Sequence, residues 1–296
     1  MATIQGSIVA LVTPMVTGQE PETALDDAAL ERLLEFHIEQ GTDGIVAVGT
    51  TGESATLNEH EHCGLIKRTV EIVAGRIPVI AGTGANSTHE AIRLTQCAKE
   101  AGADACLLVT PYYNKPSQEG LYLHHKAVAE AVDIDQILYN VPGRTACDMS
   151  PETVGRLASV SNIVGIKEAT AEVDRVARLR ELCGEAFVLL SGDDETACDF
   201  MLAGGQGVIS VTANVTPNLM HAMCEAALNG DESRAREVDS KLRSLHRDLF
   251  LEANPIPVKW AVAELGLLDP GIRLPLTWLA DEFQSQVRSA MNDAGV

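Results

Sequence analysis

Short apolar runs alternate with segments of helical spacing along most of the chain. Each run has four to eight residues, is rich in Val and Ile, and ends in Gly, Thr, Pro, Asn or Asp. Runs without polar alternation are typical of parallel strands that are buried on both faces. The eight runs begin at Ser7, Gly44, Pro78, Ala105, Gln136, Ile163, Phe187 and Gly207.

The segments between the runs carry helix signals. Apolar residues recur at helical spacing, Ser150 precedes Pro151 as an N-cap would, and Gly102 and Gly184 fall where helices should stop. Eight consecutive βα units need parallel pairing and right-handed crossovers, which a closed (β/α)8 TIM barrel provides most simply. An open doubly wound α/β sheet is the alternative.

The strand pattern ceases after Asn214, and the rest of the chain has a helical pattern. Breaks occur near Gly230, at residues 254–257 and at Leu274-Pro275. We therefore expect residues 1–228 to form the catalytic barrel. Residues 229–296 are expected to form a C-terminal extension of two or three helices.

Composition and charge narrow the class of protein. A hydrophobic fraction of 46% with only 4% aromatic residues is typical of a soluble α/β protein. The net charge of −20 disfavours nucleic acid and anionic membrane surfaces as partners. Neither a signal peptide nor an apolar run long enough to span a membrane is present, so we expect a cytoplasmic protein. Seven cysteines without a C-x-x-C pair predict buried or reduced thiols rather than a disulfide framework.

Lys167 ends the apolar run IVGIKEAT, where a parallel barrel gathers its catalytic residues. Apolar neighbours disfavour an ammonium ion and favour a free amine that can condense with a carbonyl group. Lys167 is therefore a candidate Schiff-base nucleophile. The alternative is a structural lysine that pairs with Glu168 or Asp193.

Two other strand ends offer groups that would complement such a lysine. Tyr139 ends the preceding run, so its hydroxyl could transfer protons at the Lys167 adduct, although it could also be a packed tyrosine with a solvated hydroxyl. The turn Gly49 to Gly52 offers backbone N–H groups and two threonine hydroxyls to a carboxylate or an oxyanion. Glycine and threonine also end strands for ordinary turn reasons.

Motifs for cofactors and metals are absent from the sequence. It contains no complete dinucleotide fingerprint, no phosphate-binding P-loop and no G-x-S-x-G. His60 and His62 are two residues apart on an expected helix, so their side chains would point apart and not share a metal ion. We expect neither a metal nor an organic cofactor.

Several segments together form a specific pattern. They are GTTGES at Gly49, TPYYNKPSQEGLY at Thr110, YNVPGRT at Tyr139, GIKEAT at Gly165, LLSGDD at Leu189, GVISVTANV at Gly207 and NPIPVKWA at Asn254. In this combination the chain closely resembles the dihydrodipicolinate synthase family over nearly its whole length. GTTGE alone is shared with the wider pyruvate-lyase superfamily.

The resemblance implies a lyase that condenses pyruvate with L-aspartate 4-semialdehyde to 4-hydroxy-tetrahydrodipicolinate, in diaminopimelate and lysine biosynthesis. It implies that Lys167 forms the Schiff base with pyruvate and that Tyr139 shuttles protons. Thr50 would link Tyr139 to Tyr113, which the family contributes across a dimer interface. The family is usually a homotetramer built as a dimer of tight dimers. The implied substrate-binding residues are Thr51, Arg144, Gly192 and Ile209.

The resemblance also implies feedback inhibition by L-lysine, bound between the two chains of a tight dimer. The matching positions are Ser54, Ala55, His62, Asn86, Glu90 and Tyr112. Glu59 departs from some strongly regulated members, which carry histidine there. These positions could instead be ordinary polar residues at helix starts.

Other functions remain open from the residues alone. Another Schiff-base pyruvate lyase, such as an N-acetylneuraminate lyase or a sugar keto-acid aldolase, would share Lys167 and Tyr139 but should differ around Arg144. A metal-dependent aldolase and a non-catalytic small-molecule binding barrel are the rivals from other classes.

Overall fold

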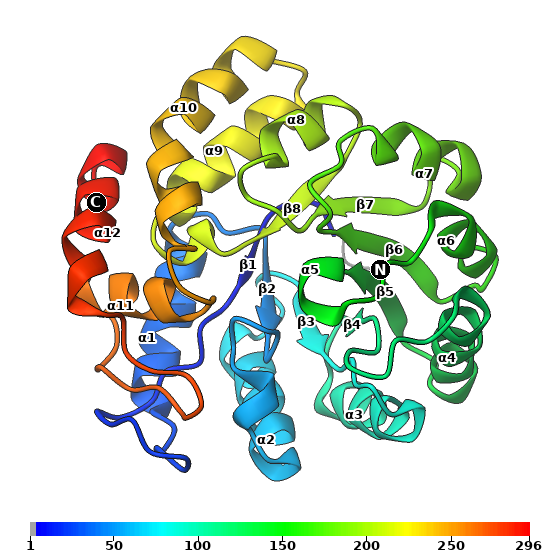
Figure 1. Cartoon of the computed structure of the whole chain (residues 1–296), viewed down its shortest axis with the longest axis horizontal. Helices are drawn as coiled ribbons and strands as arrows, with labels where there is room; N and C mark the ends of the chain where they lie inside the picture. The colour runs from blue at the N-terminus through cyan, green and yellow to red at the C-terminus, as the bar shows by residue number, and fades with distance from the viewer. Residues whose placement is uncertain (1–3) are drawn as a thin grey trace.

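The computed structural model describes residues 4–296, so residues 1–3 of the predicted barrel lie outside the described part. The eight strands form one closed parallel barrel in chain order, with helices around it (Figure 1). β1 pairs with both β2 and β8. This closure confirms the predicted TIM barrel and excludes the open sheet.

Each strand overlaps one of the predicted apolar runs. The runs form strands because their Val, Ile and Leu side chains are buried on both faces. The strands are β1 Gly6–Ala10, β2 Gly44–Ala47, β3 Val79–Gly82, β4 Ala105–Val109, β5 Asp135–Asn140, β6 Ile163–Glu168, β7 Val188–Ser191 and β8 Gly207–Ser210.

The helices begin and end at the expected signals. Ser150 caps the helix that starts at Pro151, and Gly102 and Gly184 follow the last residues of two others. The helices are α1 Asp27–Glu39, α2 Glu59–Val73, α3 Thr88–Ala101, α4 Gln118–Ala131, α5 Pro142–Thr145, α6 Pro151–Leu157, α7 Arg175–Cys183, α8 Ala197–Leu202, α9 Pro217–Leu228, α10 Glu232–Asp248, α11 Ile256–Glu264 and α12 Asp281–Ala294. Two short 3₁₀ helices, η1 Ser54–Thr56 and η2 Thr212–Asn214, follow β2 and β8.

The helices after α9 form the C-terminal extension, drawn in orange and red in Figure 1. α10 packs against α9 and α12, and α11 contacts α12 and η2. The residues between α10 and α11 return to the barrel, where Phe250 and Asn254 reach its mouth. The extension and the barrel share one apolar core, so no break in packing marks a boundary between them. The expected division after residue 228 therefore stays a prediction.

Two cysteines correct the prediction of reduced thiols. Cys63 on α2 and Cys97 on α3 form a disulfide, with their Cα atoms 6.1 Å apart. The pairing arises because α2 and α3 pack side by side, which the spacing in the sequence does not reveal. The other five cysteines are free, and four of them are buried as expected. Within residues 4–296, no helix is both long enough and apolar enough to cross a bilayer.

Candidate active site

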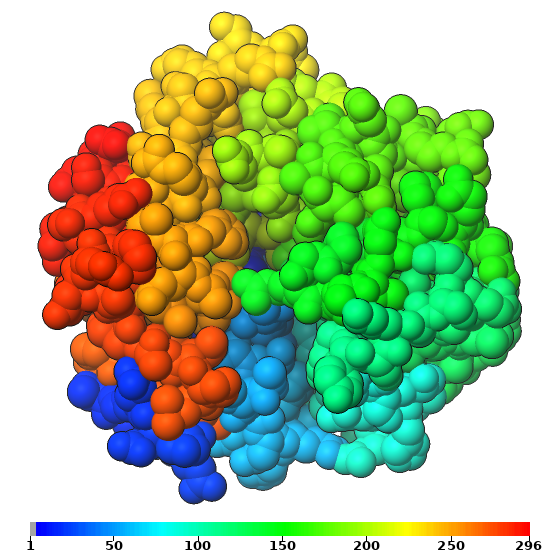
Figure 2. Space-filling view, in the orientation of Figure 1, coloured from blue at the N-terminus to red at the C-terminus, as the bar shows by residue number. Residues whose placement is uncertain are grey.

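A cavity of about 170 Å³ opens at the carboxyl ends of the strands. Figure 2 shows the hollow near the centre of this face, between the blue, green and orange segments. Its wall includes residues from both the barrel and the extension. The wall includes Thr50, Thr51, Tyr139, Arg144, Lys167, Gly192, Asp193, Phe250 and Asn254.

Lys167 points into this cavity from β6. Only 6% of the residue is exposed. β6 pairs with β5 so that Lys167 lies opposite Tyr139, and the Lys167 Nζ is 4.3 Å from the centre of the Tyr139 ring. The register of two adjacent strands thus brings the Lys167 amine close to the Tyr139 ring, and the role of the hydroxyl stays a prediction.

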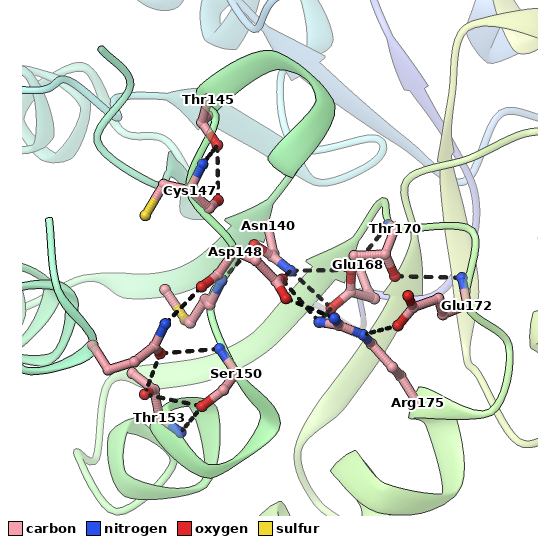
Figure 3. Close-up of polar contacts among 12 residues, drawn as sticks. Asn140, Thr145, Cys147, Asp148, Ser150, Thr153, Glu168, Thr170, Glu172 and Arg175 are labelled. Carbon is pink, nitrogen blue, oxygen red and sulfur yellow. Dashed lines mark hydrogen bonds and ion pairs between the residues drawn. The ribbon is translucent and has the colours of Figure 1, made fainter. Parts of the chain in front are cut away.

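The carboxylates suggested as partners of Lys167 are engaged elsewhere. Successive side chains on a strand point to opposite faces, so Glu168 points away from the barrel interior. Glu168 accepts hydrogen bonds from Asn140 Nδ2 at 3.2 Å and lies 3.6 Å from the Arg175 guanidinium (Figure 3). Burial raises the pKa of Glu168, and contacts with Asn140 and Arg175 oppose this rise.

Asp193 is also committed to a local contact. Its Oδ2 accepts a hydrogen bond from the Thr196 hydroxyl at 2.7 Å. Within residues 4–296, Lys167 therefore forms no ion pair, and the structural alternative for this lysine is wrong. A buried amine without a carboxylate partner is available to react with a carbonyl group.

Gly192 leaves the space that the Lys167 side chain occupies. A Cβ atom at Gly192 would lie 2.8 Å from Lys167 Cε and 2.7 Å from Ala169 Cβ. Real Cβ atoms do not approach other carbons this closely, so a larger residue here would displace the lysine. The position of Gly192 at the end of β7 is thus a steric requirement of the site.

The turn after β2 forms the opposite wall, and its backbone is unusual. Val48 and Glu53, at its two ends, have φ angles of 49° and 58°. A left-handed backbone is costly for non-glycine residues, so surrounding contacts must hold both of them. The turn places Thr50 and Thr51 in the cavity wall, and Thr51 Oγ1 accepts a hydrogen bond from Asn254 Nδ2 at 3.0 Å.

Arg144 lies on α5, a single turn of helix that the sequence did not predict. Its Nη2 donates to the main-chain oxygen of Asn254 at 3.3 Å. The guanidinium thus lies at the mouth of the cavity with most of its donors free for a carboxylate. The wall combines an amine, a phenol, two hydroxyls and a guanidinium, which suits a small anionic carbonyl compound.

Comparisons with known proteins agree with this geometry. The model of the dihydrodipicolinate synthetase family matches residues 3–294. The 4-hydroxy-tetrahydrodipicolinate synthase of Methylococcus capsulatus is 68% identical, over 99% of each chain. The chain belongs to the dihydrodipicolinate synthetase family.

Solved structures of family members have the same fold. A chloride-inhibited dihydrodipicolinate synthase from Acinetobacter baumannii, solved with pyruvate, is 56% identical, has a TM-score of 0.96 and aligns over 99% of each chain. The lysine-bound enzyme from Cyanidioschyzon merolae is 39% identical, with a TM-score of 0.94, and the match covers 100% of this chain and 99% of that one.

A second cavity, of about 400 Å³, lies beside the first and shares part of its wall. It gathers five of the six residues that the family resemblance implied for lysine binding, namely Ser54, Ala55, His62, Glu90 and Tyr112. Asn86 is not in its wall. Glu59, the departure from some family members, also lines this cavity and forms an ion pair with Arg93.

Two side chains of this second cavity have shifted pKa values. Burial lowers the pKa of His62, whose Nε2 lies 2.8 Å from the Gly82 carbonyl oxygen. A neutral imidazole that donates this bond fits the burial. Burial and the Glu90 carboxylate raise the pKa of Tyr112, so its hydroxyl stays protonated as a donor.

Two implied active-site residues lie outside the catalytic cavity in the single chain. Tyr113 is 89% exposed and has a φ of 74°. Ile209 is buried in the barrel interior in the same apolar cluster as Tyr139, without reaching the cavity wall. Sequence reasoning missed Phe250 and gave no role to Asn254. The only signal near them was the break at residues 254–257.

Metal-binding side chains do not converge in the described part of the chain. Among residues 4–296, no group of three or more His, Cys, Asp or Glu side chains is placed to hold an ion.

Proposed function

We propose that this chain is a lyase that condenses pyruvate with L-aspartate 4-semialdehyde to 4-hydroxy-tetrahydrodipicolinate, in the diaminopimelate route to lysine. One observation carries the proposal. Lys167 is a buried amine without an ion-pair partner among residues 4–296, and it lies 4.3 Å from the Tyr139 ring. The synthase from Methylococcus capsulatus, 68% identical, supports this assignment.

The reaction begins at the carbonyl carbon of pyruvate. The Lys167 amine forms a C–N bond there, and the carbonyl oxygen leaves as water, giving a protonated imine. Loss of a proton from the methyl group gives an enamine, which forms a C–C bond with the aldehyde carbon of the second substrate. The aldehyde oxygen takes a proton and becomes the hydroxyl of the product, and the imine is regenerated. The amino group of that substrate then attacks the imine carbon, which closes the ring and releases Lys167.

Tyr139 serves the proton transfers of these steps. The centre of its ring lies 4.3 Å from the Lys167 Nζ, so Tyr139 is close to the reacting nitrogen. It can give a proton to the departing oxygen and take one back later. Thr50 and Thr51 are placed to hold the carboxylate of pyruvate, and Arg144 the carboxylate of the semialdehyde.

Because the chain is acidic, binding of an anionic substrate needs basic side chains in the cavity. With a net charge of −20, the protein as a whole repels anions such as pyruvate. Arg144 supplies positive charge at the cavity itself, and Lys167 contributes positive charge once it has formed the protonated imine. Binding of an anionic substrate therefore depends on these two side chains and on the turn after β2.

We also propose that the active form is a homo-oligomer, a tetramer built as a dimer of tight dimers. Tyr113 would reach the active site of the partner chain, with Thr50 linking it to Tyr139. Its 89% exposure and the strained backbone that projects it support a role outside its own chain. Gly192 and Ile209 would contribute backbone groups to the substrate site. A cytoplasmic location fits a biosynthetic enzyme of this kind.

L-Lysine is the proposed inhibitor, bound in the second cavity. Glu90 would bind one of its ammonium groups, while Tyr112, His62 and the polar backbone of Ser54 and Ala55 complete the wall. Asn86, whose carbonyl oxygen accepts a hydrogen bond from Asn114 next to Tyr113, would join the site at the proposed dimer interface. The lysine-bound structure from Cyanidioschyzon merolae supports this proposal.

Covalent trapping tests the function directly. Borohydride added with pyruvate should attach one pyruvate-derived group per chain, and peptide mapping should place it on Lys167. The Lys167→Ala variant should not be trapped, whereas Lys126→Ala, at a partly exposed lysine of α4, should be trapped like the native chain. Trapping of Lys167→Ala at the native rate would refute the assignment.

Turnover of the second substrate separates this function from that of a related lyase. A sugar keto-acid aldolase would also be trapped by pyruvate and borohydride. It would not consume L-aspartate 4-semialdehyde. The measurement is therefore the rate of product formation from both substrates, followed with the trapping result on the same preparation.

A further inference from the structure

A buried ion pair joins the C-terminal extension to the turn after β2. Lys259 of α11 lies with its Nζ 2.5 Å from Glu53 Oε1, and both side chains have 0% exposure. Lys259 is among the largest fully buried side chains of the protein. Burying two charges is costly, so this pair is by itself weak evidence for a contribution to stability.

The second oxygen of Glu53 is also held by the extension. Arg273, in the segment between α11 and α12, donates its backbone N–H to Glu53 Oε2 at 3.2 Å. The Arg273 guanidinium forms two bonds with Glu61 of α2, at 2.7 and 2.8 Å, and one with the Thr56 carbonyl oxygen. Both oxygens of Glu53 are thus fixed from outside the turn.

The same turn is held at a second point. Asn254 donates its Nδ2 to Thr51 Oγ1 at 3.0 Å, as described above. Thr51 and Glu53 are only two residues apart, and both are tied to residues more than 200 positions later in the chain. The eight βα units alone would leave this turn without either restraint.

The restraints act where the backbone is strained. Glu53 has a φ of 58°, in the left-handed region that non-glycine residues rarely adopt. Such a conformation persists only where its surroundings enforce it. If the carboxylate of Glu53 were released, the turn could relax and carry Thr50 and Thr51 away from the cavity.

We infer that Lys259 is a positioning residue for the reaction, because its ion pair with Glu53 fixes the turn that presents Thr50 and Thr51 to the pyruvate carboxylate. This inference rests on the proposed function. It means that the C-terminal extension also positions part of the substrate-binding site. Lys259 touches no substrate, and its effect passes through Glu53 and the backbone of the turn.

The experiment must separate positioning from stability. Removing one partner of a buried ion pair leaves an uncompensated charge and destabilises strongly, whereas replacing both partners by neutral side chains of similar size restores stability. The test variant is therefore the double substitution Lys259→Met with Glu53→Gln. The matched control is Arg234→Met with Glu237→Gln, which removes an exposed ion pair of α10.

The double variant is expected to melt within a few degrees of the native protein. Its kcat/KM for pyruvate is expected to fall about 10- to 100-fold, since a misplacement of about 1 Å can cost a factor of 100. Most of the loss should appear in the pyruvate KM, with trapping at Lys167 preserved at high pyruvate. The control variant should keep native values of both melting temperature and kcat/KM.

A second variant covers the case in which the double variant fails to fold. Glu53→Asp keeps both charges but shortens the side chain by one methylene, so it should raise the pyruvate KM while the chain remains folded. Native kcat/KM in whichever of these variants folds would overturn the inference. If trapping still maps to Lys167 in that experiment, the proposed function stands and only the positioning role fails.

Discussion

The two cavities at the mouth of the barrel share a wall but differ in charge. Thr50, Ser54, Arg144 and Asn254 belong to both. The catalytic cavity is lined by two basic side chains, Arg144 and Lys167, and by one carboxylate, Asp193. The second cavity is lined instead by three carboxylates, Glu53, Glu59 and Glu90.

Ion pairs reduce the number of free charges in the second cavity. Glu53 is neutralised by Lys259, and Glu59 by Arg93. Over residues 4–296, the carboxylate of Glu90 has no ion pair, and neither has the amine of Lys167. The unpaired Glu90 carboxylate suits the cationic amino acid that we propose for the second cavity, whereas the basic side chains of the catalytic cavity suit an anionic keto acid.

The largest expected effect comes from the phenol of the catalytic cavity. Tyr139→Phe removes only a hydroxyl, so the fold should be unchanged. The rate should fall about 100-fold or more, the usual scale of lost acid–base help. Steady-state kinetics with circular dichroism as a control tests this. A variant that retains native kcat would exclude Tyr139 from proton transfer.

A substitution of Arg144 tests the role of the wall that the two cavities share. Arg144→Ala should lower kcat/KM for L-aspartate 4-semialdehyde about 10- to 100-fold, the value of a charge-assisted bond to a carboxylate. The rate of pyruvate trapping at Lys167 should change much less. Equal losses in both measurements would show that Arg144 does not select the aldehyde substrate.

A substitution of Glu90 tests ligand binding in the second cavity, because Glu90 does not line the catalytic cavity. Binding of L-lysine should inhibit several-fold to about a hundred-fold, the usual range of coupling between sites. Glu90→Ala should abolish the binding heat of lysine in calorimetry and preserve the rate without lysine. Glu100→Ala, at the far end of α3, is the control and should leave lysine binding intact. An absence of inhibition and binding heat at millimolar lysine in the native protein would remove the hypothesis.

The smallest effect concerns the packing of α3, the helix that carries Glu90. His124 of α4 is buried, and its Nδ1 lies 2.9 Å from the Thr88 hydroxyl at the start of α3. Burial lowers the pKa of His124 to about 4. The unfolded chain, with an ordinary histidine pKa of about 6.5, therefore binds a proton that the folded chain does not.

The sign of the pH dependence follows from this difference. The contribution of His124 to the free energy of unfolding should be constant above about pH 6.5. It should fall by about 1–3 kcal/mol as the pH drops from about 6.5 to 4. Urea unfolding at pH 7 and pH 5 measures the fall. It should be smaller in His124→Gln than in the native protein, and equal falls would rule out His124 as its source.

The barrel and its central pair were predictable because they depend on local pattern. The apolar runs marked the strands. A lysine ends one run and a tyrosine ends the preceding run, and strands that are consecutive in the chain are usually neighbours in space. Lys167 and Tyr139 could therefore be placed without knowledge of side-chain packing. The family resemblance then supplied the substrates, which no periodicity can reveal.

Contacts between distant segments were not predictable in this way. Asn254, Phe250 and Lys259 reach the barrel from the extension, and their positions depend on how α10 and α11 pack. The disulfide between Cys63 and Cys97 depends likewise on the alignment of two helix faces. Tyr113 is exposed in the single chain, and its proposed contact with another chain could not be predicted from the pattern of one chain.

The tie between the extension and the turn after β2 has a consequence for the timing of biosynthesis. A ribosome makes Thr51 and Glu53 early, but their partners Asn254 and Lys259 follow 203 and 206 residues later. Ribosomes add about 5–20 residues per second, so the residues that restrain the turn are made on the order of ten seconds or more after the turn itself. A nascent chain with all eight strands already exposed would therefore still lack a finished substrate site, and catalytic competence arrives only with the last part of the polypeptide.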